Sequence, residues 1–152
     1  MKEPLSFQEK QNIVSLVNTI LILGLYSLYV YQKYLTADPT LINNLKFWGQ
    51  AFLMLIPITI VVQVIIHIVF VIINKIVTNE DAPNFTDERD KMIDLKALRA
   101  SHWVFILGFF LAMGSQAIDM QPYIMFFILI ASGFTAGIVS DVAKIYFYRK
   151  GI

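Results

Sequence analysis

The sequence predicts an all-α membrane protein with four transmembrane helices in two hairpins. Residues 47–74 form a run of 28 residues without an Asp, Glu, Lys or Arg, and one further apolar stretch precedes it and two follow. An α-helix needs about 20 apolar residues to cross the hydrocarbon core of a bilayer. We therefore expect spans near residues 13–31, 47–74, 102–117 and 122–146.

The composition favours a single membrane domain over residues 1–152. Hydrophobic residues make up 57% of the chain and charged residues 15%, and the mean hydropathy is +0.65. A soluble domain with that balance would lack the polar surface needed to cover itself. The polar N-terminal segment is followed by no small-residue cleavage site, so we expect it to be retained.

The basic residues predict that both termini face the cytoplasm, because Lys and Arg near span ends favour that side. With the N-terminus inside, ten of the twelve basic residues are cytoplasmic and only Lys33 and Lys46 are outside. Aromatic side chains, which prefer membrane interfaces, gather near the expected outer ends of the first two spans. Pro57 should kink the second span, since it removes a backbone hydrogen bond and clashes with the preceding turn.

The third span is expected to start as a charged cytoplasmic helix over about residues 87–101. Thr86 is a suitable N-cap, and no Gly or Pro interrupts the chain from Asp87 to Gly108. Leu98 belongs to a thin apolar stripe on this helix. The stripe has two interpretations: the helix leans on the membrane surface or on its own bundle, or the helix is a docking site for a partner. The candidate docking residues are Asp87, Glu88, Arg89, Asp90, Met92 and Leu95.

A resemblance adds to this interpretation. The run Asp87, Glu88, Arg89, Asp90, followed by Met92, Ile93, Lys96, Ala97 and Arg99 and leading into a span, resembles the DER(D/E)xxI segment of uncharacterised four-helix proteins of bacterial inner membranes. Genes of that family often lie beside small helix-turn-helix repressors. The resemblance implies a bacterial cytoplasmic membrane and a regulatory partnership, and it carries over no catalytic residue.

The fourth span carries a ridge of small residues at Gly133 and Gly137, overlapped by Ser132, Ala136 and Ser140. Small residues four apart let another helix approach closely. Two interpretations remain open: packing inside the four-helix bundle, with Gly108 and Gly114 of the third span as the facing groove, or the seam of a homodimer.

Polar residues within the spans gather in the predicted cytoplasmic half. Ionisable groups are costly in hydrocarbon and normally face protein or water, so this set is expected to line a water-accessible vestibule. His67 and Asp141 fall at similar depth, and they form either a coupled pair or a structural histidine and an interfacial aspartate near Lys144. The vestibule set comprises Asn18, Gln63, His67, Ser140 and Asp141.

No pattern in the sequence predicts catalysis. The chain has no cysteine, no Gly-rich phosphate loop and only two distant histidines, so we expect no catalytic residue, no cofactor and no metal. A net charge of +1 disfavours direct binding to nucleic acid.

The sequence therefore predicts a non-enzymatic, multi-pass integral protein of a bacterial inner membrane. It would act through its cytoplasmic helix or inner vestibule as a regulatory or immunity-type partner of a cytosolic or membrane protein. The alternative is a small dimeric transporter coupled to protons or ions.

Overall fold

The structure is a computed structural model that describes residues 5–79 and 87–151. Within these ranges the chain is helical and contains no strand, as predicted. The elements are α1 (Phe7–Val30), a π-helical turn η1 (Tyr31–Leu35), a short 3-10 helix η2 (Pro39–Asn43), α2 (Leu45–Thr78), α3 (Glu88–Ala117) and α4 (Pro122–Lys150).

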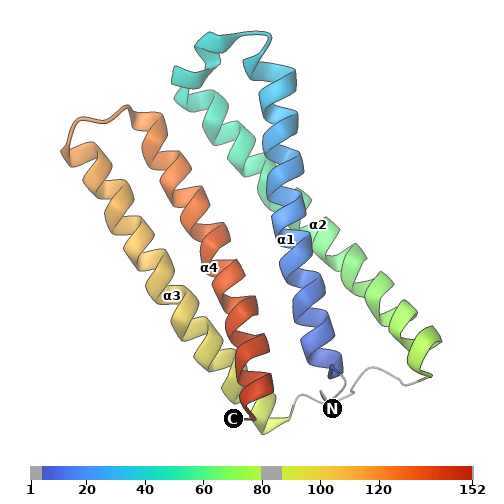
Figure 1. Cartoon of the computed structure of the whole chain (residues 1–152). Coiled ribbons are helices and arrows are strands. Elements are labelled where there is room, and N and C mark those ends of the chain that lie inside the picture. The colour runs from blue at the N-terminus through green and yellow to red at the C-terminus, as the bar shows by residue number, and fades with distance from the viewer. Residues whose placement is uncertain (1–4, 80–86, 152) are drawn as a thin grey trace.

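The long helices lie side by side in the order α3, α4, α1 and α2 (Figure 1). The most extensive packing joins α3 to α4, α4 also packs on α1, and α1 packs on α2. Near η2, Trp48 and Phe52 of α2 contact Phe127 of α4. The start of α1 and the end of α4 lie at the same end of the bundle, here called the terminal end. The opposite end, with η1 and η2, is the hairpin end.

All four long helices are long and apolar enough to cross a membrane. They contain 24, 34, 30 and 29 residues, so each measures about 36 to 51 Å against a hydrocarbon core of about 30 Å. Each helix is therefore longer than the span predicted for it. Large apolar side chains such as Leu25 and Leu53 are exposed on the bundle surface, as expected for helices that face lipid.

The ends of the helices have recognisable caps. Asp87 is the N-cap of α3, and its carboxylate accepts a hydrogen bond from the Glu88 backbone N–H at 2.7 Å. The predicted cap, Thr86, lies outside the described residues. The prediction that the charged helix continues directly into the third span is confirmed, because α3 runs unbroken to Ala117. Helix α2 also continues through Pro57.

Small residues bring α3 close to α4. A Cβ atom added to Gly108 would overlap the Oγ and Cβ atoms of Ser132, so this contact requires glycine. Ala136 of α4 is also buried, whereas Gly133 and Gly137 have open space where a side chain would begin. Within the predicted ridge and groove, Gly108 therefore meets Ser132, and nothing lies within 4 Å of the Cβ positions of Gly133 and Gly137. The buried face of α3 comprises Ile93, Ala97, Ser101, Gly108, Ala112 and Ser115.

Candidate functional site

A chain of side-chain hydrogen bonds links α1 to α2 within their apolar segments. The Asn18 amide donates to Gln63 Oε1 at 2.7 Å, and Gln63 Nε2 donates to Ser15 Oγ at 2.8 Å. Asn18 is almost fully buried. Because an unpaired amide in an apolar environment costs several kcal/mol, these bonds fix which faces of α1 and α2 meet.

The Ser15 hydroxyl also lies near the carboxyl of Asp141 on α4, so a third helix borders this chain of hydrogen bonds. Three of the predicted vestibule residues, Asn18, Gln63 and Asp141, therefore gather around Ser15. We call Ser15, Asn18, Gln63 and Asp141 the polar network. Ser140 is half-buried beside Asp141 and takes part in none of the hydrogen bonds found among the described residues.

His67 contacts Gln11 rather than Asp141, which the sequence had suggested as one possible partner. Its Nδ1 atom lies 3.3 Å from Nε2 of Gln11, one turn along α2 from Gln63, and its side chain is exposed. No contact with Asp141 occurs among the interactions of residues 5–79 and 87–151. In the polar network Asp141 therefore lies near Ser15, and His67 lies at the edge of the network.

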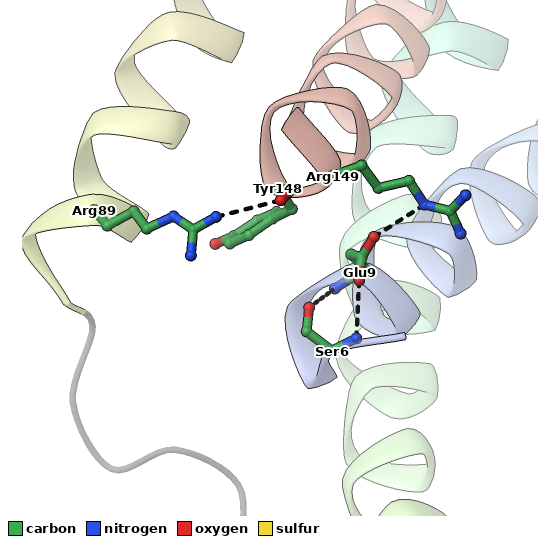
Figure 2. Close-up of polar contacts among 5 residues, drawn as sticks. All are labelled: Ser6, Glu9, Arg89, Tyr148 and Arg149. Carbon is green, nitrogen blue, oxygen red and sulfur yellow. Dashed lines mark hydrogen bonds and ion pairs between the residues drawn. The ribbon is translucent and has the colours of Figure 1, made fainter. Parts of the chain in front are cut away.

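A second polar cluster joins α1 to α4 at the terminal end (Figure 2). The Glu9 carboxylate accepts hydrogen bonds from the Ser6 backbone N–H at 2.9 Å and from Arg149 Nε at 3.1 Å. Ser6 in turn accepts from the Glu9 backbone N–H, which completes a capping box at the start of α1. Glu9 precedes the predicted first span, and its side chain is buried in this cluster.

The same cluster reaches α3. Arg89 donates to the backbone carbonyl of Tyr148 at 3.2 Å, as Figure 2 shows, and the Tyr148 hydroxyl donates to Asp90 at 2.8 Å. Tyr148 follows the predicted fourth span, and burial together with this bond to Asp90 raises the pKa of its hydroxyl. The set Ser6, Glu9, Arg89, Asp90, Tyr148 and Arg149, here called the terminal clasp, ties together the ends of α1, α3 and α4.

The Ser6–Glu9 spacing is a capping-box signature, so it could have revealed one part of the clasp from the sequence. No sequence pattern comparable to the capping box indicated that Tyr148 and Arg149 belong to the clasp. They lie at the other end of the chain, and only the packing of α4 between α1 and α3 brings them to Glu9 and Asp90.

Further contacts hold the start of α3 against α4. Lys144 pairs with Asp94 at 2.9 Å, and Lys96 lies over the Phe147 ring at 5.7 Å. Ile93 and Ala97 are completely buried in this contact. The opposite side remains open: the exposed fractions of Met92, Leu95 and Leu98 are 55%, 67% and 63%. We call these three side chains the α3 stripe.

The chain matches no protein-family model, no curated protein and no solved structure. The described residues also contain no group of three His, Cys, Asp or Glu side chains that could hold a metal ion. The candidate sites are therefore defined by their own geometry: the polar network among α1, α2 and α4, and the α3 stripe supported by the terminal clasp.

Proposed function

We propose that this chain is a non-enzymatic integral protein of a bacterial inner membrane that acts as a regulatory or immunity-type partner of a cytosolic protein. The observation that carries the proposal is the α3 stripe. Its apolar side chains are exposed, while Ile93 and Ala97 on the other side of the same helix are fully buried against α4. The helix is thus held in place by one face, and the other face is available.

The positions of the basic residues support an orientation with the terminal end in the cytoplasm. Lys33 and Lys46 belong to the hairpin-end segments, and the other nine Lys and Arg residues within the described ranges lie toward the terminal end. A cytoplasmic terminal end would expose the α3 stripe to cytosolic proteins. The resemblance of residues 87–99 to bacterial four-helix proteins points to the same compartment.

The chemistry of the stripe suits a partner with an apolar groove. Met92 and Leu95 have the i, i+3 spacing of anchors in helix-in-groove recognition, and Leu98 extends the apolar surface by another three residues. Lys91 and Arg99 are exposed beside Leu95, and Glu88 is exposed one turn before Met92, so a groove with an acidic rim near Leu95 and a basic rim near Met92 would complement the surface.

Site-specific photocrosslinking tests this function. A photoreactive amino acid at Leu95 should give a discrete protein adduct in cells, whereas the same group at Val77, which is exposed at the end of α2, should not. The adduct identifies the partner, which is then purified. Leu95→Asp should weaken its binding about tenfold or more, as for an apolar anchor. Equal adducts from Leu95 and Val77, or unchanged binding by Leu95→Asp, would refute the proposal.

The orientation has its own test, since the chain contains no cysteine. In intact cells an impermeant maleimide should label Asn43→Cys at the hairpin end and should not label Lys91→Cys on α3. Labelling of Lys91→Cys before the cells are opened would place the stripe on the outer surface and remove the cytosolic partner.

A second candidate function, proton- or ion-coupled transport by a dimer, is favoured by the polar network. A carboxyl such as Asp141 among hydroxyl and amide groups of two other helices is the kind of group to which transport is coupled. Purified protein in liposomes carrying a pH-sensitive dye should then show a flux that Asp141→Asn abolishes and Asp38→Asn, in the hairpin-end loop, leaves unchanged. Absence of flux in the wild-type protein would exclude this candidate.

A further inference from the structure

A long apolar cleft runs between α1 and α2 on the hairpin side of the polar network. Its volume is about 1070 Å³, and its walls are mostly aliphatic. The cleft extends along η1 and α1, from Tyr34 at the hairpin end to Asn18, the buried amide of the polar network. Large side chains on both walls remain exposed, among them Leu25 at 65% and Leu53 at 70%.

The mouth of this cleft carries a positive charge. The Lys33 ammonium donates to the Tyr29 hydroxyl at 2.7 Å and lies over the rings of Tyr29 and Tyr34, 5.0 and 5.5 Å from their centroids. Both tyrosines line the cleft, so the ammonium is held at its rim.

We propose that the cleft binds one anionic phospholipid, with an acyl chain between α1 and α2 and the phosphate at Lys33. An ammonium and a phenol hydroxyl at the rim can both donate to phosphate oxygens. The cleft covers 17 residues of helical chain from Asn18 to Tyr34, or about 24 Å, and one leaflet contributes about 15 Å of hydrocarbon. One acyl chain therefore fits along its length.

The ammonium of Lys33 at the rim favours an occupant that carries a negative charge at one end and is apolar along the rest of its length, as an anionic phospholipid is. A helix from a second copy of the chain would be about 10 Å wide with its side chains, and an acyl chain is much thinner. The charge at the mouth distinguishes the proposed lipid from the neutral lipids that surround any membrane protein.

Native mass spectrometry of the full chain, with phosphatidylglycerol and phosphatidylcholine of identical acyl chains, tests the proposal. The wild-type protein should retain one phosphatidylglycerol in preference to phosphatidylcholine. Lys33→Gln should reduce that preference about fivefold, the effect of one basic residue near anionic lipid. Lys150→Gln is the matched control, because Lys150 also lies over a tyrosine ring, that of Tyr146 at 5.6 Å, but at the terminal end.

Filling the cleft tests the acyl-chain site separately. Leu25→Trp should reduce retention of both lipids, and Ile58→Trp on the opposite wall serves the same purpose if the first variant does not fold. Equal retention of the two lipids by the wild-type protein, or equal effects of Lys33→Gln and Lys150→Gln, would show ordinary surrounding lipid only. Unchanged retention in the tryptophan variants, or a dimer that excludes lipid, would also overturn the proposal.

Discussion

The guanidinium of Arg149 lies 3.1 Å from the carboxylate of Glu9 and joins the last turn of α4 to the first turn of α1 across 140 positions of sequence. Arg89 and Asp90 of α3 bind the adjacent Tyr148. The terminal clasp therefore fixes three helices at the end where the α3 stripe is exposed, which keeps the stripe in a constant position relative to the bundle.

Glu9 should make the folded protein less stable in acid. Bonds from the Ser6 backbone and from Arg149 hold the pKa of Glu9 below its ordinary value of 4.5, although burial opposes them. Because this pKa is lower in the folded state, the stability it contributes is complete above the unfolded-state value and disappears as the pH falls through the folded-state pKa. Thermal unfolding in detergent between pH 7 and 3 should therefore show a smaller acid loss for Glu9→Gln than for the wild type.

Two further variants separate the contributions to Glu9. Arg149→Gln should reduce the acid loss only in part, because the Ser6 bond remains. Lys150 is next to Arg149 in the chain, but among the described residues it makes no bond to Glu9. The Lys150→Gln variant should therefore behave like the wild type. Identical pH profiles for Glu9→Gln and the wild type would contradict this role of Glu9.

Gly108 should tolerate no larger side chain. Gly108→Leu would insert four carbon atoms where a single Cβ already overlaps Ser132, so we expect a loss of about 1 to 3 kcal/mol in unfolding free energy. Gly114→Leu is the matched control on the same helix, because nothing lies within 4 Å of its Cβ position. Unfolding in increasing SDS measures both, and equal losses would show that the close approach at residue 108 is not limiting.

Much of the fold could be predicted because apolar length and charge distribution act locally. The uninterrupted run of residues 47–74 and the absence of breakers between Asp87 and Gly108 were enough to place α2 and the continuous α3. Helix ends were less predictable, since α1, α2 and α4 extend beyond the apolar segments by turns whose polar residues are stabilised through caps and contacts with other helices.

Only part of the polar network could be named from the sequence, and its pairing could not. Asn18, Gln63 and Asp141 fall in the same half of the spans as His67 and Ser140, but rotation of each helix about its axis decides which of them meet. That rotation places Ser15 between Gln63 and Asp141 and directs His67 to Gln11. The rotation of each helix depends on how whole helix faces pack together, and no local pattern in the sequence predicts that packing.

A proline at position 94 should break the exposed part of α3. Proline removes one backbone hydrogen bond and clashes with the preceding turn, which costs about 3 kcal/mol or more inside a helix. Asp94→Ala is the control, since it removes only the ion pair with Lys144, which is worth about 1 kcal/mol or less at a partly exposed site. Spin labels at positions 91–99 should show helical periodicity in Asp94→Ala and lose it in Asp94→Pro. Periodicity in both variants would contradict the prediction.

The hydrogen bonds of the polar network should be coupled to one another. Gln63→Leu removes the acceptor of Asn18 and the donor to Ser15 at once, so it leaves a buried amide without its partner. In a double-mutant cycle with Asn18→Leu, we expect a coupling energy of about 0.6 kcal/mol and at most about 1.7 kcal/mol, as for hydrogen bonds between other transmembrane helices. Val64→Leu, on an exposed position of α2, controls for the change in size. Unfolding in SDS gives all four free energies, and a coupling energy near zero would mean that Asn18 and Gln63 do not hold α1 and α2 together.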